Sequence, residues 1–263
     1  MPHESPAPVL TPPTRHERIL KVLDRLLYDR DFREAFTTDG PASDRLTLDA
    51  DLVDAFGRVD VHELALVGRN IRSEVVSGGT GTGPGLKGAF PRTLDELRER
   101  RGVAVNQVAE QFIASPSFQR FRDVPFSPYG RGTTLPECFH RFMAGRPPAL
   151  DPLGELEPLV HHEAAAAVVR AVATGAHATF DVTLGHMAFH GGVLCGFRAY
   201  DETPEAWLLK PTMFLAGGGR CVIGPARRPL YEALTTFLDG RLDALAPQVR
   251  TSLEDRVRAW GLR

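Results

Sequence analysis

Residues 211–224 read PTMFLAGGGRCVIG, two short apolar runs on either side of three consecutive glycines. Glycine readily adopts the positive φ angles that a tight turn between antiparallel strands needs. The pattern therefore predicts a β-hairpin that turns within residues 216–220. Two further runs with strand-like alternation precede it, so we expect a small antiparallel sheet. The expected strands are 177–185, 193–201, 205–216 and 220–224.

Helical patterns flank these strands on both sides. Residues 153–175 read as one long helix with an alanine-rich centre, which is suited to close packing. Residues 229–242 and 249–262 repeat their apolar positions at three- and four-residue steps after the last strand. The sequence therefore predicts an α+β fold in which helical units come first and a sheet with C-terminal helices comes last.

The first half of the chain reads as two helical units. Ile19, Leu23 and Leu26 begin an apolar stripe that continues through several short helices. Proline, glycine and serine clusters mark the expected boundaries. The expected organisation is a disordered tail at 1–14, a helical unit at 15–76, a flexible linker at 77–88, a second helical unit at 89–145, and an α+β domain at 151–263.

The glycine-rich stretch SGGTGTGPGLKG, residues 77–88, raises the question of phosphate binding. A phosphate-binding loop needs glycine before its lysine and serine or threonine after it. Here Lys87 follows Leu86 and precedes Gly88, and an amphipathic helix rather than a buried strand comes before the loop. Since glycine with serine and threonine is typical of a flexible connector, we interpret the stretch as a hinge.

Composition gives little reason to expect a nucleic-acid or membrane partner. The chain has 31 basic and 33 acidic residues, so its net charge does not attract polyanions. It contains no apolar run long enough to cross a bilayer and begins without a secretory signal pattern. Its three cysteines, Cys138, Cys195 and Cys221, are widely spaced and suit a reducing compartment. We therefore expect a cytoplasmic protein.

One group of residues could hold iron. His186 and His190 lie near Asp201, and two histidines with one carboxylate are a known ligand set for ferrous iron. In an extended strand, however, a four-residue spacing separates the two rings by about 13 Å. An iron site would require a turn between them, and partly exposed strand histidines are the alternative interpretation.

No other pattern indicates catalysis. His161, His162 and Glu163 are consecutive in a predicted helix, where neighbours point about 100° apart and cannot hold one ion together. The sequence has no nucleophile elbow, no zinc-protease motif and no paired cysteine ligands. We therefore expect no catalytic residues, and no cofactor unless the iron alternative holds.

The predicted sheet could instead bind an extended peptide along an open edge. Main-chain hydrogen bonds supply affinity in this mode, and side chains next to the edge supply specificity. Large apolar residues in and beside the last strands are the candidates, although they could also simply fill the core. These candidate peptide-binding residues are Trp207, Leu209, Met213, Leu215 and Tyr231.

Residues 19–75 look like the helical leader segments of ribosomally made, modified peptides of the nitrile-hydratase-like and Nif11-like kind. The shared features are a helix, an acidic break, a Phe-x-x-x-Phe pair at Phe32 and Phe36, a Leu-x-Leu helix start and a short final helix. This chain continues for nearly two hundred residues past that segment, unlike a precursor with a short core peptide.

Residues 89–143 resemble the helical domain of partner proteins for multinuclear non-haem iron oxidases that modify peptides. The shared features are Ala-Phe-Pro before a helix, a Phe-Ile-x-x-x-Pro helix end and a closing helix rich in phenylalanine. Residues 204–263 resemble a winged-helix recognition element, with a hairpin, a Leu-Asp-Gly helix end at 238–240 and a last helix. In such a system the oxidase holds the iron and the partner protein holds the precursor.

These resemblances imply a non-catalytic partner that recognises a precursor peptide, a modifying oxidase or both, during maturation of a ribosomally made peptide. The alternative is a non-haem iron oxygenase that uses His186, His190 and a carboxylate such as Asp201.

Overall fold

The structure is a computed structural model of the whole chain. It describes residues 14–79, 83–123, 132–145, 156–175, 184, 187–200 and 208–263. Two compact units divide the chain, Met1–Ile71 and Arg72–Arg263. Over the described ranges, no helix is both long and apolar enough to cross a membrane.

The first unit is built from short helices around a phenylalanine-rich core. Thr14 begins the first helix with a capping box to Glu17, and Asp29 caps the second by accepting from the Phe32 N–H at 3.0 Å. Phe32 and Phe36 lie in the core, where Phe36 meets Phe56 edge-on at 6.4 Å between ring centroids. The helices are α1 (Arg15–Tyr28), α2 (Arg30–Asp39), α3 (Ala50–Phe56) and α4 (Val61–Ser77).

The boundary between the units lies inside α4, whereas the sequence predicts a hinge at residues 77–88. Much of that stretch is structured, because Gly79 and Gly83 exchange two backbone hydrogen bonds of 3.0 Å and α5 (Gly85–Ala89) begins directly after them. Gly78 and Gly85 both have positive φ, and a Cβ on either would come within 2.3 Å of backbone atoms of the facing segment. The glycines therefore permit a tight backbone crossing between α4 and α5.

The second unit contains a helical layer followed by a sheet. The helical layer has a core of packed phenylalanines, in which Phe139 meets Phe90 at a tilt, at 4.6 Å, and Phe112 edge-on, at 5.3 Å between ring centroids. Its remaining helices are α6 (Pro91–Arg101), α7 (Val105–Ile113), α8 (Pro116–Asp123), α9 (Leu135–Ala144) and α10 (Glu157–Gly175).

Four antiparallel strands form the sheet in the order β1–β2–β3–β4. The predicted hairpin is present. Gly218 and Gly219, with φ angles of 56° and 74°, form the turn between β3 and β4. The strands are β1 (Met187–His190), β2 (Val193–Arg198), β3 (Thr212–Gly217) and β4 (Arg220–Pro225). Two helices follow, α11 (Arg228–Leu238) and α12 (Pro247–Ala259), with a short 3-10 turn, η4 (Leu242–Ala244), between them.

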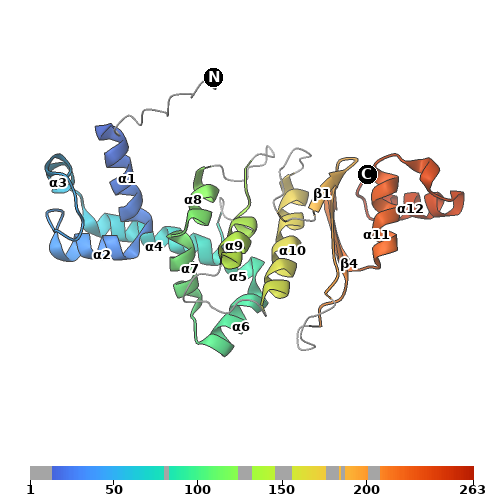
Figure 1. Cartoon of the computed structure of the whole chain (residues 1–263), viewed down its shortest axis with the longest axis horizontal. Coiled ribbons are helices and arrows are strands. Elements are labelled where there is room, and N and C mark those ends of the chain that lie inside the picture. Colours follow the sequence, from blue (N-terminus) through green and yellow to red (C-terminus); the bar gives the residue numbers. More distant parts are fainter. Residues whose placement is uncertain are drawn as a thin grey trace, which may run out of the picture. The chain divides into compact units, whose positions relative to one another are not determined.

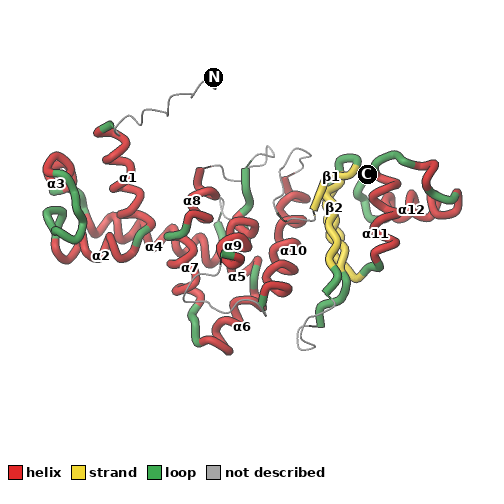
Figure 2. The backbone as a smooth tube through the Cα atoms, in the orientation of Figure 1, coloured by secondary structure: helices red, strands yellow, loops and turns green. Residues whose placement is uncertain are grey.

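Helices cover both faces of this sheet (Figures 1 and 2). Side chains at alternate positions point to opposite faces of a strand. Cys195 and Leu215 therefore face the core shared with α11 and α12, while Phe214 faces α10 and meets the His162 ring at 5.4 Å. The α+β prediction, with a small antiparallel sheet and C-terminal helices, is confirmed.

The structure differs from the sequence predictions in two details. The strand predicted at 205–216 begins only at Thr212, because the chain before it holds Pro211 and Leu208, the latter with a φ of 49°. Helix α10 packs against α9 on one side and against β3 and β4 on the other, which joins the expected domains 89–145 and 151–263 in one unit. The strand predicted at 177–185 lies almost wholly outside the described residues.

Candidate functional site

Strand β4 forms one edge of the sheet and pairs only with β3 among the described strands. The pair next to a two-residue turn, Gly217 and Arg220, is hydrogen-bonded, and such pairs alternate along an antiparallel ladder. The backbone groups of Val222 and Gly224 therefore point toward β3, and those of Cys221 and Ile223 point away from it. Strand β4 thus offers unused main-chain donors and acceptors, which is the requirement for adding a strand.

The two faces of β4 have different surroundings. Helix α10 packs on the face toward which Cys221 and Ile223 point. Helix α11 packs chiefly on β2, where Tyr231 stacks on Phe197 with 5.5 Å between ring centroids. Half-buried apolar side chains on this second face lie on β4, in the link after it and on α11. We call this set the β4–α11 strip, and its members are Val222, Ala226, Leu230 and Tyr231.

A glycine leaves a notch beside this strip. Gly224 lies opposite Met213, which in turn lies opposite Phe197, so the three residues form one row across the sheet. A Cβ built on Gly224 would meet no atom within 4 Å. The row of side chains consequently stops one strand before the edge, and there is space for a side chain supplied from outside.

The segment of chain around β4 carries positive charge. Between Leu208 and Tyr231 the sequence has no acidic residue but four basic ones. All four are exposed, and none forms an ion pair with a described carboxylate. Arg228 also lies 5.2 Å from the centroid of the Phe197 ring, so its guanidinium is held over β2, two strands from β4. The four are Lys210, Arg220, Arg227 and Arg228.

The predicted peptide-binding residues separate into different environments. Tyr231 is half-buried on α11 against Phe197 of β2, and Leu209 is partly exposed just before β3. Met213 and Leu215 are 4% and 0% exposed in the core beneath α11 and α12, so they support the edge from below and do not line it. Trp207 lies outside the described residues.

Sequence reasoning missed Gly224, which leaves the notch, and the arginines, which supply the positive charge. The signal for the arginines was the absence of any aspartate or glutamate from residues 208–231, in a chain that has 31 basic and 33 acidic residues in all.

The proposed iron ligands are only partly described. His190 directs Nδ1 toward the Asp239 carboxylate, at 3.0 and 3.1 Å from its two oxygens. His186 and Asp201 lie outside the described residues. Across the parts of the chain that the structure describes, no three His, Cys, Asp or Glu side chains gather as a metal site.

Three consecutive polar residues of α10 make three separate contacts. The His161 ring meets the His140 ring of α9 at 5.6 Å, and His162 Nδ1 lies 3.2 Å from the Tyr200 hydroxyl next to the sheet. Glu163 accepts hydrogen bonds from the backbone N–H groups of Arg92 and Thr93, at 2.9 and 3.0 Å. These residues anchor α10 to α9, to the sheet side and to α6, as their divergent directions on a helix require.

Glu163 acts as the N-terminal cap of another helix. Helix α6 has no capping side chain of its own at Phe90, and Glu163 binds the second and third N–H groups of that helix instead. Burial raises the pKa of the Glu163 carboxyl, and the hydrogen bonds from Thr93 and Arg92 oppose that rise. Burial also lowers the pKa of His162, which favours a neutral imidazole.

The two buried cysteines are poorly suited to nucleophilic chemistry. Burial raises the pKa of Cys138 and of Cys195 to about 12 in each case. The thiolate is the reactive form of cysteine, so both side chains stay protonated at neutral pH. They contribute to the core as small apolar groups.

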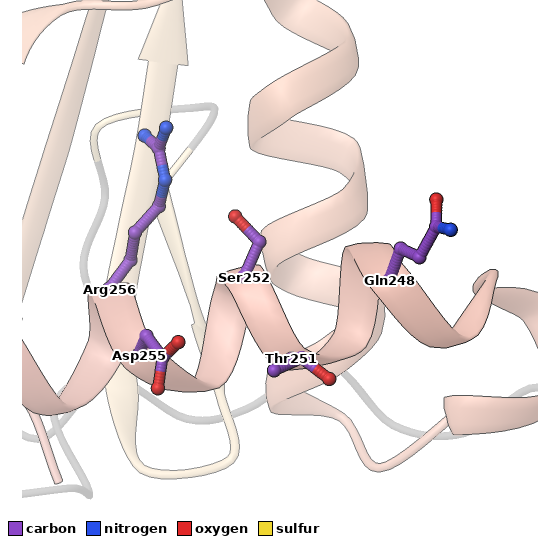
Figure 3. A pocket seen from close by; sticks show the side chains of 5 residues that line it. All are labelled: Gln248, Thr251, Ser252, Asp255 and Arg256. Atoms are coloured by element: carbon purple, nitrogen blue, oxygen red, sulfur yellow. The ribbon is translucent and has the colours of Figure 1, made fainter.

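A shallow polar hollow lies along α12 (Figure 3). Gln248, Ser252 and Arg256 extend from one row of the helix, and Thr251 and Asp255 extend from a neighbouring row. The groups come from a single exposed helix and do not converge on one point, so we assign no chemistry to this hollow.

Comparison of the chain with protein-family models, with curated proteins and with solved structures found no match.

Proposed function

We propose that this chain is a non-catalytic partner that binds an extended peptide along the outer edge of β4. The observation that carries the proposal is the open edge itself, with the backbone groups of Cys221 and Ile223 directed away from β3. An added strand would form main-chain hydrogen bonds there, and its alternate side chains would lie on the face of the sheet that carries Val222 and Gly224.

The sequence resemblances indicate a biological setting for such binding. We infer that the peptide is the precursor of a ribosomally made, modified peptide, and that a cytoplasmic iron-dependent oxidase is the second partner. The first unit supports this inference because its helix order and its buried Phe32 and Phe36 agree with the leader-like pattern.

Cys221→Pro tests the edge directly. Proline lacks a backbone N–H, and its ring would project toward an incoming strand. Pro225 already occupies an outward-facing position of the same strand, so the fold accepts proline at such sites. We expect the variant to stay folded and to bind short peptides encoded by neighbouring genes at least about tenfold more weakly, measured by fluorescence anisotropy.

Cys221→Ala is the matched control, because it removes the same exposed thiol and keeps the N–H group. Ile223→Pro and Ile223→Ala repeat the comparison one outward position along. Equal affinity of the proline and alanine variants at both positions would exclude β4 as the binding edge. Failure of every neighbouring peptide and oxidase to bind the unmodified chain would exclude the proposed function.

A further inference from the structure

We propose that, when no peptide is bound, a second copy of this chain covers the edge of β4 by pairing its own β4 against it. This inference rests on the proposed function, because it names what regulates access to the same edge. It follows from the open edge, from the absence of charge along the middle of β4 and from the fit of this strand to its own copy.

The middle of β4 lacks the features that protect an open strand edge. Sheets discourage edge-to-edge pairing with charged side chains, with bulges or with proline at edge positions. The four residues from Cys221 to Gly224 are uncharged, and Pro225 blocks only the end of the strand. The pairing of β4 with β3 runs from Arg220 to Pro225 without a bulge. Nothing along the middle of β4 therefore prevents pairing with an identical edge.

Symmetry and hydrogen bonding favour one register. Two copies related by a two-fold axis must pair their β4 strands antiparallel. The outward backbone groups are those of Cys221 and Ile223, so Cys221 of one copy can lie opposite Ile223 of the other on both sides of the axis. Each of these pairs exchanges two main-chain hydrogen bonds. Val222 then lies opposite Val222 of the second copy, at the axis.

The neighbouring registers use the edge less well. An axis at Ile223 would place Cys221 opposite Pro225, which has no N–H to donate. An axis at Cys221 would place Ile223 opposite Gly219, a turn residue with a φ of 74° and not an extended one. The register centred on Val222 is therefore the one that pairs every outward N–H of the middle of β4.

The side chains also fit in the register centred on Val222. On the face that carries Val222 and Gly224, Arg220 of the second copy lies opposite Gly224. A Cβ on Gly224 would meet no atom within 4 Å, so the longest side chain of the strand faces the notch. On the face toward α10, the small Cys221 lies opposite Ile223. The strand is therefore complementary to itself on both faces.

A contact of this kind should be weak and reversible. It involves chiefly the residues of β4, against roughly 20–30 residues a side in a stable interface. The stretch from Leu208 to Tyr231 has no acidic residue, so the two copies also bring like charges together. We therefore expect an association that added salt strengthens and that a peptide bound at the edge displaces.

An engineered cysteine tests the register in the full chain. In a non-hydrogen-bonded antiparallel pair the Cα atoms lie about 4.5 Å apart, a separation that a disulfide can span. Val222→Cys in a Cys221→Ala background should therefore form a disulfide-linked dimer when oxidised with diamide. Cys138 and Cys195 are both 0% exposed and should stay reduced. Leu208→Cys in the same background is the control, because position 208 is 81% exposed and lies outside β4.

The rate of cross-linking, followed on non-reducing gels, gives the outcome. We expect Val222→Cys to cross-link at least about tenfold faster than Leu208→Cys at equal protein concentration. Adding Ile223→Pro, which removes an outward N–H, should slow the Val222→Cys reaction about tenfold, whereas Ile223→Ala should slow it only about twofold. Equal rates for Val222→Cys and Leu208→Cys, or equal effects of proline and alanine at position 223, would overturn the inference.

Peptide binding to the cross-linked dimer separates this inference from the proposed function. Neighbouring-gene peptides that bind the reduced Val222→Cys protein should bind its disulfide-linked dimer at least about tenfold more weakly, and regain full affinity with reductant. Unchanged affinity of the dimer would overturn the control of peptide access. Peptide binding without preferential cross-linking would overturn the inference alone. Preferential cross-linking without binding of any peptide would overturn the proposed function and leave the self-pairing of β4 in place.

Discussion

Helix α10 and strand β4 lie against each other, yet their exposed chemistry differs. The polar residues of α10 contact partners in α9, in α6 and beside the sheet, and the helix is covered on both sides. Strand β4 has an open edge, a notch at Gly224 and basic neighbours without described acidic partners. The polar cluster of α10 (His161, His162 and Glu163), which resembles a catalytic or metal-binding motif in the sequence, therefore has a structural role. The candidate binding site lies on β4 instead.

In this chain, whether a polar group already has a contact partner within the protein says more about its function than its residue type does. A histidine or glutamate with every direction occupied by protein is no longer available to a ligand. A backbone edge with unused donors remains available, whatever side chains it carries.

The largest expected effect comes from removing the contact between α10 and the sheet. Phe214 is 1% exposed and meets the His162 ring, so Phe214→Ala should lower the free energy of unfolding by about 3–5 kcal/mol in urea titrations. Leu208→Ala, at an 81% exposed position, is the control and should change stability by less than about 0.5 kcal/mol. Similar values for both would contradict the described burial.

The β3–β4 turn gives a matched pair of glycines with the next largest effect. Both have positive φ, but a Cβ on Gly218 would lie 2.5 Å from the Gly261 carbonyl oxygen, whereas one on Gly219 meets nothing within 4 Å. Gly218→Ala should cost roughly 1–3 kcal/mol more than Gly219→Ala, because it adds a backbone clash to the same φ strain. Thermal unfolding of the two variants measures the difference, and equal costs would contradict the close approach.

Protonation of the Glu163 carboxyl makes the free energy of unfolding depend on pH. Glu163→Gln should cost about 1 kcal/mol, since the amide oxygen can keep one of the two bonds to the N-terminus of α6. Burial raises the folded-state pKa above the ordinary value of 4.5, so folding favours the protonated form. Stability from this carboxyl is therefore fully present below pH 4.5 and is lost as pH rises through the raised folded-state pKa.

Urea titrations of the wild type and Glu163→Gln at several pH values test this linkage. The advantage of the wild type over the variant should shrink as pH rises from 4.5 toward neutrality. An advantage that grows with pH would mean that the hydrogen bonds outweigh burial and that the pKa shift has the opposite sign.

The smallest expected effect concerns His190. Its pair with Asp239 is partly exposed, so His190→Ala should change stability by at most about 1 kcal/mol. The same variant tests the iron alternative through metal analysis of purified protein. Stoichiometric iron in the wild type that is lost from the variant would favour the oxygenase interpretation over peptide binding.

The fold was largely predictable because its signals are local. Gly218 and Gly219, two of the three consecutive glycines, form the β3–β4 turn, and the alanine-rich stretch became a helix buried on several sides. The start of β3 was misplaced because apolar Leu208 and Leu209 resemble strand residues, while Pro211 and the positive φ of Leu208 exclude them from the ladder.

The candidate site was less predictable because it depends on which face of β4 is covered. Alternation shows that Met213 and Leu215 share a face, but only the position of α11 reveals that this face is core. The role of Glu163 was equally hidden, since the helix it caps begins about seventy residues earlier in the chain. The local hint of such a cap was that Phe90, the residue before α6, has no side chain that can cap the helix.

The central position of α10 also limits how the chain can be divided. A fragment cut at residues 146–155 would expose one side of this helix to water whichever half retained it, because α9 and the strands β3 and β4 hold opposite sides. Protein engineers who exchange the sheet between homologous chains should therefore transfer α5 to α12 together. The division inside α4 offers a different place for such an exchange, since each unit there keeps its own internal contacts.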